Sequence, residues 1–447
     1  MSIFNKKRLT NETFKLDIER MRQGWYSDKY FENIGRMLTV LASEGYAYGG
    51  KLHNLPEGVS PDHIDVGNME VEMQWFTRRR GKTVVVGVDK ALSMLKHCTG
   101  YFDGDEFVDT SHELEVWAVH DGTLVEFDGD LANIQPVLRV RGRYRDFALL
   151  ETPMLGILTR ASRVATNVYE TMIAARGKPV LFFPARFDLH EVQAADGYAY
   201  NIAVQRFNHD YARELGPFVS TDAQGDWWGG AGGGTVAHAA IASFLGDTAE
   251  AMMQFARILP AHIPRIALVD FNNDSIADSL STLDTMFTKY RALIDAGNQA
   301  EAAKYVLYGV RLDTSGSLRD LSVPPLGDPA LDLGVTPRLV FNVRQALDAA
   351  WQRWNLPETW KTRAQEYCQN VKIVVSGGFN PQKIQRFEQL CVPADVYAVG
   401  SYLFNNNGQT VTDYTADVVR VKVHDEWVDM AKVGRAYCQN KDLERVW

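Results

Sequence analysis

The sequence predicts an α/β protein, in which an N-terminal α/β domain precedes an irregular or incomplete α/β barrel. From Glu151 onward, short apolar segments of strand length alternate with amphipathic segments of helix length. This alternation is typical of a parallel sheet covered by helices. After Ser401 the stretch VVRVKVHDEWVDMAKV has the pattern of strands, so we expect the tail to pack on the N-terminal domain. The expected segments are therefore 1–150, 151–400 and 401–447.

The composition is that of a folded protein with a large core. The chain has 447 residues, of which 46% are hydrophobic and 23% charged. Its net charge of −9 argues against a general nucleic-acid binder. No apolar run approaches the ~20 residues that cross a bilayer, and the start has no signal-peptide pattern, so we expect no membrane association. The four cysteines form no C-x-x-C pair, which favours a reduced, cytoplasmic protein.

Within residues 1–150, helical spacing alternates with strand patterns. Apolar periodicity predicts helices over 16–22 and 34–41. Apolar runs predict strands at Thr83–Val88, Glu115–Val119 and Val137–Val140. The stretch RVRGRYRDF (Arg139–Phe147) alternates charge at strand spacing. It is either the solvated edge of a sheet or a segment that presents arginines to a diphosphate.

The second segment contains five apolar strands with helices between them. The helices are marked by apolar spacing over 283–294, where Gly297 supplies a stop, and over 340–354. The expected strands are Val180–Phe183, Ile266–Val269, Tyr308–Leu312, Lys372–Val375 and Val396–Val399.

Polar or glycine-rich groups follow each of these five strands. Any one group could be a simple turn. In parallel α/β folds, however, the carboxyl ends of the strands meet at one face, where sites form. We therefore expect the five groups to converge on one site. They are Pro184-Ala185-Arg186; Asp270, Asn272, Asn273 and Asp274; Arg311, Asp313, Thr314 and Ser315; Ser376-Gly377-Gly378; and Gly400-Ser401.

Two features indicate a phosphorylated ligand. The SGG and VGS groups end the last two strands, where barrels often bind phosphate through backbone N–H groups. The run GGAGGGTVAHAAIASF (Gly229–Phe244) opens an expected helix, with Thr235 near its N-cap and His238 in its first turn. A lone histidine is more often structural than catalytic. Because His238 follows a glycine loop at the start of a helix, we weigh a catalytic role and a structural role for it equally.

Eight motifs in order resemble the nicotinate phosphoribosyltransferase family, of the shorter microbial type. The resemblance runs from about Ser27 to Val421. The motifs are SDKYF (Ser27–Phe31), GRYRDFALLETPMLGILTRAS (Gly142–Ser162), FPAR (Phe183–Arg186), GGGTVAH (Gly232–His238), LVDFNND (Leu268–Asp274), GVRLDTSGS (Gly309–Ser317), VVSGGF (Val374–Phe379) and YAVGSYL (Tyr397–Leu403).

The resemblance implies a homodimer whose active sites are completed by the neighbouring subunit. It implies a pentosyltransferase that joins nicotinate to phosphoribosyl pyrophosphate, giving nicotinate mononucleotide and pyrophosphate in NAD biosynthesis or salvage. Magnesium would accompany the pyrophosphate. ATP hydrolysis would be coupled in a ligase-type reaction if ATP is used.

The resemblance also implies roles for individual residues. Phe183 would stack on one face of the pyridine, and Tyr30 of the neighbouring subunit would cover the other. Arg186 and Arg311 would contact the carboxylate or a phosphate, and Asp313 would face the ribose and the metal. His238 would be phosphorylated by ATP and oriented by Asp270. The 5′-phosphate would lie on the backbone of Ser376, Gly377, Gly378, Gly400 and Ser401.

Departures from the family pattern leave alternatives open. Pro184 replaces a usual glycine, Phe187 replaces a frequent second arginine, and the Asp313–Ser317 stretch differs from the family's D-S-G-D. The substrate could therefore be nicotinamide or another pyridine, or the chain could be a non-catalytic nucleotide-binding paralogue. An aldolase or isomerase acting on another sugar phosphate is disfavoured because Lys372 begins its strand rather than ending it.

Overall fold

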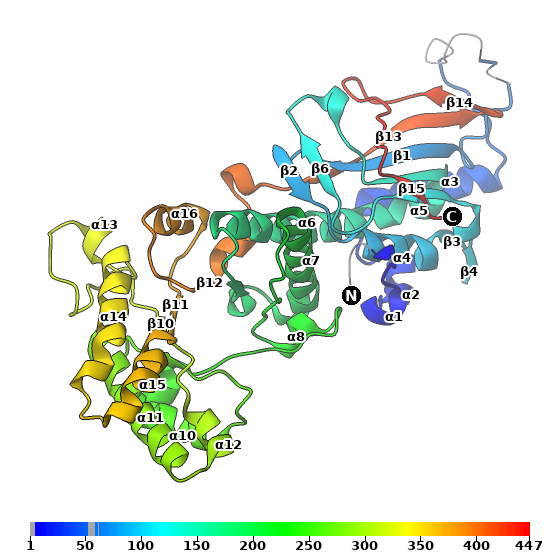
Figure 1. Ribbon diagram of the computed structural model, residues 1–447. Coiled ribbons are helices and arrows are strands. Elements are labelled where there is room, and N and C mark those ends of the chain that lie inside the picture. The colour runs from blue at the N-terminus through cyan, green and yellow to red at the C-terminus, as the bar shows by residue number, and fades with distance from the viewer. Residues whose placement is uncertain (1–4, 52–58, 61) are drawn as a thin grey trace. The chain divides into compact units, whose positions relative to one another are not determined.

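The computed structural model describes residues 5–51, 59–60 and 62–447, which form two compact units (Figure 1). Unit 1 comprises Met1–Tyr169, Ala194–Tyr211 and Asn405–Trp447, and unit 2 comprises Glu170–Gln193 and Ala212–Phe404. This division differs from the boundaries expected near residues 150 and 400. The helices α6 (Glu151–Ala174) and α7 (Gln193–Tyr211) contribute most of their residues to unit 1.

Unit 1 is built on a six-stranded antiparallel sheet that the C-terminal tail completes. The tail strand β13 pairs with β1 from Val71↔Val421 to Thr77↔Tyr414, with a bulge between Glu72 and Met73, so the predicted return of the tail is confirmed (Figure 1). In spatial order the strands are β14 (Glu426–Asp429), β13 (Tyr414–Val423), β1 (Glu70–Thr77), β7 (Leu138–Arg143), β5 (Glu115–Ala118) and β15 (Glu444–Arg445).

One face of this sheet forms the core of unit 1. Residues of β7 alternate between buried and half-buried, which is the period-two pattern of a strand with one covered face. Trp75 and Val140 are fully buried in one apolar cluster with Leu95 of α4 (Val88–Cys98) and Leu158 of α6. The smaller elements of unit 1 are α1 (Asn11–Phe14), α2 (Ile18–Arg22), α3 (Lys29–Ser43), α5 (Tyr144–Phe147), the pair β2 (Gly81–Val84) and β6 (Leu124–Phe127), and the pair β3 (Gly100–Asp103) and β4 (Glu106–Asp109).

Two sequence predictions for unit 1 are wrong. The strand expected at Thr83–Val88 ends at Val84, because Gly87 adopts φ +102° and α4 begins at Val88. A side chain at Gly87 would also come within 3.0 Å of the Ile157 carbonyl oxygen. The arginine-rich stretch is not a sheet edge, because β7 lies between β1 and β5.

Unit 2 contains a five-stranded parallel sheet that does not close into a barrel within the described residues, consistent with the incomplete barrel predicted. All five expected strands are present. In spatial order they are β8 (Val180–Phe182), β12 (Val396–Val399), β11 (Lys372–Val375), β10 (Gly309–Leu312) and β9 (Ile266–Leu268).

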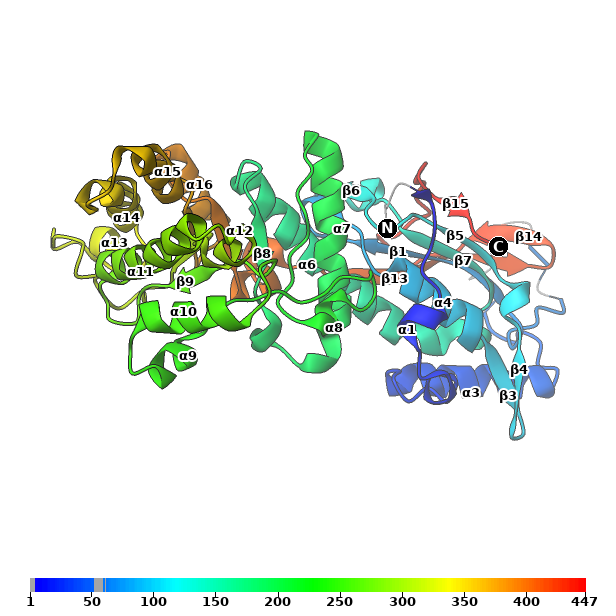
Figure 2. The ribbon, with the colours of Figure 1, turned by 60° about the horizontal axis from the view of Figure 1, so that its bottom comes forward.

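The helices of unit 2 begin at capped positions, which follow from the sequence. Asp274, Thr336 and Asn380 each accept a hydrogen bond from a backbone N–H in the first turn of α11, α14 and α16. The helices α10, α11, α14 and α15 pack in succession (Figure 2). The helices are α8 (Asp222–Gly225), α9 (His238–Ser243), α10 (Thr248–Ile258), α11 (Ser275–Asp295), α12 (Gln299–Ala302), α13 (Pro329–Asp332), α14 (Pro337–Ala349), α15 (Glu358–Gln369) and α16 (Pro381–Gln389). Across the described ranges, none of the helices combines the length and the hydrophobicity that a membrane-spanning segment requires.

Candidate active site

A cavity of about 460 Å³ lies within unit 2, where the carboxyl ends of four parallel strands meet. Groups that follow β8, β10, β11 and β12 line it, as the sequence predicts. Asp270, which follows β9, is hydrogen-bonded to the lining residue His238. The cavity is lined by Phe183, Ala185, Arg186, Phe187, Ser220, Ala237, His238, Arg311, Asp313, Ser376, Gly377, Gly378, Phe379, Ala398, Gly400 and Ser401.

His238 and Asp270 form a hydrogen-bonded pair. His238 Nε2 lies 3.0 Å from Asp270 Oδ1 and 3.1 Å from Oδ2. The Asp270 side chain is only 8% exposed, whereas the His238 side chain is 45% exposed. Burial raises the pKa of Asp270 above its ordinary value, although the nearby His238 opposes this shift. A buried carboxylate on one ring nitrogen fixes the tautomer and the ring orientation.

The helix that carries His238 begins differently from the sequence prediction. His238 is the first residue of α9, and its N-cap is Ala237 rather than Thr235. The glycine run before it is held to a neighbouring segment, because Gly233 N–H donates to Val219 O and Gly232 N–H donates to Asp222 Oδ1. Thr235 is therefore not the cap, although His238 does lie in the first turn.

The loop after β11 supplies backbone groups to the cavity. Ser376 Oγ donates to Asp313 Oδ1 at 2.7 Å, which ties this loop to the end of β10. Gly377 and Gly378 adopt φ +81° and +68°, a region that favours glycine. Consecutive backbone N–H groups in such turns form anion-binding concavities.

Two arginines supply positive charge to the cavity. Neither Arg186 nor Arg311 forms an ion pair with any described residue. The Nε of Arg311 is buried and has no hydrogen-bond partner in the described chain. An unpaired guanidinium in a cavity wall is suited to bind a carboxylate or phosphate in bidentate geometry.

Aromatic rings form a further part of the wall. Phe183 N–H donates to Val399 O, and the Phe183 ring lies 6.0 Å from that of Phe218, centroid to centroid. The Phe187 ring rests against Gly400, where a Cβ would lie 2.7 Å from Phe187 Cε2. The Arg186 guanidinium carbon lies 5.5 Å from the centroid of the Phe187 ring. Phe187, a departure from the family pattern, is thus part of the cavity.

Tyr30 belongs to unit 1, whereas every lining residue of this cavity belongs to unit 2. It lies in the first turn of α3 and is 58% exposed. Its ring is 4.3 Å from that of Phe31, and with Tyr144 and Glu151 it borders a separate recess of unit 1. Burial raises the pKa of Glu151 to about 8, with Asp417 and Asp28 adding to the effect.

Some lining residues were not predicted from the sequence. Ser220 comes from a loop without a distinctive motif. Ala237, Phe379 and Ala398 lie within the quoted motifs, but as apolar residues they were given no role in the expected site. The expected magnesium contact, Asp313, has one oxygen bonded to Ser376, so its other oxygen could bind a hard cation. Among the described residues, no group of three His, Cys, Asp or Glu side chains could hold a metal by itself. Asp313 therefore fits an ion carried mainly by the phosphates of a substrate.

Comparisons with known proteins agree with this architecture. Residues 59–162 match the family model of the quinolinate phosphoribosyl transferase N-terminal domain. Nicotinate phosphoribosyltransferase 1 of Arabidopsis thaliana is 26% identical over 212 residues, which cover 45% of this chain. The chain spans only about a third of the length of that relative, since the match covers 33% of it.

One solved structure shows the same fold. The nicotinate-nucleotide pyrophosphorylase from Pyrococcus furiosus superposes with a TM-score of 0.61 at 23% identity, covering 95% of this chain and 81% of the other. Human nicotinic acid phosphoribosyltransferase gives a TM-score of 0.48 at 16% identity, covering 88% of this chain and 74% of the other. The chain therefore has the α/β fold of the nicotinate and quinolinate phosphoribosyltransferases.

Proposed function

We propose that the protein is a phosphoribosyltransferase of NAD biosynthesis or salvage, and that it joins nicotinate to phosphoribosyl pyrophosphate. The observation that carries the proposal is one cavity in which unpaired arginines, an aromatic wall and a glycine loop meet a histidine held by a buried aspartate. These are the groups that a flat anionic pyridine and a polyphosphorylated sugar require.

In this reaction the pyridine nitrogen forms a bond to C1′ of the ribose, while the bond between C1′ and the pyrophosphate oxygen breaks. The leaving pyrophosphate takes the electron pair. Charge develops on the sugar ring and on the leaving group, so catalysis depends on positioning and on electrostatic stabilisation. A bound magnesium ion would neutralise charge on the pyrophosphate. Asp313 would contact both this ion and the ribose.

The cavity offers a place for each part of the substrates. Phe183 would stack on the pyridine, and Arg186 and Arg311 would bind its carboxylate or a phosphate. The backbone at Ser376, Gly377, Gly378, Gly400 and Ser401 would hold the 5′-phosphate. We further propose a homodimer in which Tyr30 of the neighbouring subunit covers the second pyridine face.

ATP coupling is part of this proposal. His238 Nε2 is engaged by Asp270, and no described residue bonds to Nδ1. Nδ1 would attack the γ-phosphorus of ATP, forming a phosphohistidine and releasing ADP. The negative charge of Asp270 would offset the positive charge that develops on the ring.

A second candidate substrate is quinolinate, favoured by the family model that matches residues 59–162. Quinolinate carries two carboxylates, and the cavity contains two unpaired arginines. The His238–Asp270 pair favours nicotinate with ATP. Phe187, at the place of a frequent second arginine, keeps nicotinamide as a further alternative.

The test is pyrophosphate release with phosphoribosyl pyrophosphate and magnesium, given nicotinate, nicotinamide or quinolinate in turn, each with and without ATP. We expect release with nicotinate and an increase with ATP. Release only with quinolinate or only with nicotinamide would reassign the substrate. Tight binding of nicotinate mononucleotide without turnover of any pyridine would support the non-catalytic alternative.

A further inference from the structure

Lys383 lies directly behind the glycine loop of the cavity and is not among the residues that line it. It is in the first turn of α16, and its Nζ is 3.4 Å from the carbonyl oxygen of Gly377. The same Nζ lies 4.2 Å from the centroid of the Phe379 ring. One partly buried ammonium therefore contacts both ends of the Gly377–Phe379 turn.

The charge of Lys383 is not balanced by the protein. No carboxylate of the described chain lies within ion-pair distance of its Nζ. An ammonium has three N–H donors, and only one long hydrogen bond to the protein is present. The first turn of a helix also carries partial positive charge, so a lysine is unfavourable there. Burial lowers the pKa of Lys383 to about 8.

We propose that Lys383 is a positioning residue whose ammonium holds the Gly377–Phe379 turn and whose charge is neutralised by a phosphate group bound on that turn. This inference rests on the proposed function, since it assigns a phosphate to this loop. The ammonium charge of Lys383, which the protein leaves unbalanced, would then contribute to phosphate binding. The N–H groups of the turn and the ammonium behind it together form a positive site that a phosphate dianion completes.

The ordinary alternative is that the lysine stem merely packs on Phe379. A pair of variants separates the two roles. Lys383→Met keeps an unbranched apolar stem and removes the charge, whereas Lys383→Arg keeps a charge at every accessible pH. The matched control is Lys361→Met, which removes an exposed lysine on α15 of the same unit.

The experiment compares two ligands that differ only by the phosphate. Calorimetry at about pH 7 measures the affinity of the full-length protein for nicotinate mononucleotide and for the corresponding riboside. We expect Lys383→Met to weaken binding of the mononucleotide roughly tenfold, because the bound phosphate loses a nearby positive charge, and to leave binding of the riboside unchanged. The Lys361→Met control should bind both ligands like wild type.

A pH profile gives a second measurement. The ligand phosphate is fully ionised above about pH 7. Wild-type affinity for the mononucleotide should therefore fall as pH rises through about 8, where Lys383 loses its proton. Lys383→Met should lose this dependence, and Lys383→Arg should retain affinity at high pH. The other titratable or charged groups near the loop lie in two places. In the cavity they are Asp313, His238, Arg186 and Arg311. Further along α16 they are Arg386 and Glu388, and Glu388 contacts Lys178 and Tyr397.

The outcomes separate this inference from the proposed function. If wild type and Lys383→Met bind the mononucleotide equally, the role of Lys383 is wrong and the proposed function stands. An equal loss for mononucleotide and riboside, or a wild-type profile without a fall above pH ~8, also overturns the inference. If wild type binds neither the mononucleotide nor phosphoribosyl pyrophosphate nor inorganic pyrophosphate, both proposals fail.

Discussion

His238 Nε2 contacts both oxygens of Asp270, at 3.0 and 3.1 Å, and thereby leaves Nδ1 as the ring nitrogen without a partner in the described chain. The two residues are 32 positions apart and come from the ends of different segments. Asp270 follows β9, whereas His238 begins α9 after the glycine run. The contact therefore fixes the orientation of the His238 ring and leaves Nδ1 as the nitrogen that can meet a bound molecule.

We expect His238→Ala to abolish ATP hydrolysis, because the nucleophile is removed. Asp270→Asn keeps the shape of the side chain but removes its charge, so ATP hydrolysis should fall about tenfold or more. His262→Ala, which changes an exposed histidine of the same unit, is the control. ADP release assays measure all three. Unchanged ATP hydrolysis in His238→Ala would exclude the phosphohistidine.

The raised pKa of Asp270 predicts an acid limb in ATP hydrolysis. The ionised carboxylate supports His238, and this support is lost as pH falls through a pKa that lies above the ordinary value of about 4. The same raised pKa means that ionisation of Asp270 lowers the free energy of unfolding. This loss grows as pH rises from the unfolded-state pKa of Asp270 through its higher folded-state pKa. Asp270→Asn should therefore lack the acid limb and should not lower Tm at neutral pH. A retained acid limb would assign it to another group.

The proposed sharing of active sites between subunits predicts complementation between two defective variants. Tyr30→Ala should impair every site by removing the second pyridine face, and Asp313→Ala should impair every site by removing the carboxylate. In mixed dimers formed after dissociation and reassociation, one of the two sites has both residues intact. About one quarter of all sites should then be native, and activity should exceed that of either variant alone. No gain on mixing would argue against sites shared between subunits.

Carboxylate recognition by Arg186 predicts a change that depends on the pyridine. Arg186→Met should raise KM for nicotinate roughly tenfold or more, since a charge-assisted contact is lost, and should leave KM for nicotinamide nearly unchanged. The control is Arg257→Met, which alters an exposed arginine on α10. Steady-state kinetics with both pyridines makes the comparison. Equal increases for both would place Arg186 on a phosphate instead.

The strands and the convergence of their polar ends could be predicted because both depend on local pattern. After its first residue, the segment KIVV at Lys372–Val375 is apolar and buried. Parallel strands bring their carboxyl ends to one face of the sheet, whatever the sequence of the loops. The role of Lys383 could not be predicted in this way, because a lysine on an amphipathic helix has the pattern of a solvated residue. The proposed role of Lys383 becomes visible only from its contact with the Gly377 carbonyl oxygen in the folded chain. The role proposed for Tyr30 depends on a neighbouring chain, which no local pattern specifies.

The arginine-rich strand shows a different limit. Arg139 and Arg141 alternate with apolar residues, so a solvated edge was a reasonable expectation from the sequence. Their partner, Glu72, is 67 positions before Arg139 in the chain and lies on the neighbouring strand β1. Because Glu72 supplies a buried counter-charge, these arginines can lie on a strand in the interior of the sheet, and no pattern within β7 reveals this partner.

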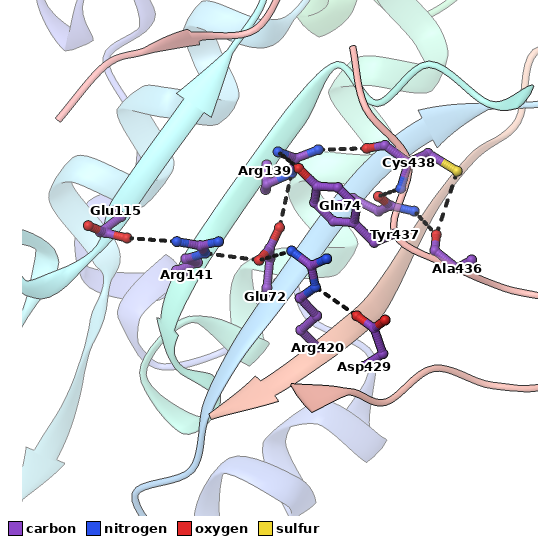
Figure 3. Close-up of polar contacts among 10 residues, drawn as sticks. All are labelled: Glu72, Gln74, Glu115, Arg139, Arg141, Arg420, Asp429, Ala436, Tyr437 and Cys438. Atoms are coloured by element: carbon purple, nitrogen blue, oxygen red, sulfur yellow. Dashed lines mark hydrogen bonds and ion pairs between the residues drawn. The ribbon is translucent and has the colours of Figure 1, made fainter. Parts of the chain in front are cut away.

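The same contact makes the stability of unit 1 dependent on Glu72. Its side chain is fully buried on the outer face of the sheet, between two arginines of β7 and one of β13 (Figure 3). Arg139 Nε lies 3.2 Å from Glu72 Oε1, Arg141 Nε lies 2.9 Å from Oε2, and a nitrogen of Arg420 lies 3.7 Å from Oε2. Tyr437 covers Arg139 and Arg420, whose guanidinium carbons lie 4.3 and 3.9 Å from its ring centroid.

Glu72→Gln should therefore destabilise unit 1 strongly, because it leaves the clustered guanidinium groups without their shared buried counter-charge. We expect a loss of about 3 kcal/mol, the cost typical of removing one partner from a buried ion pair. Asp429→Asn is the matched control: its carboxylate also bonds Arg420, at 2.8 Å, but is 82% exposed, so its loss should cost no more than about 1 kcal/mol. Urea unfolding, followed by a probe confined to unit 1, measures both. Equal effects of the two substitutions would mean that burial does not strengthen the Glu72 contacts, and that the packing of Tyr437 rather than charge pairing holds the arginines in place.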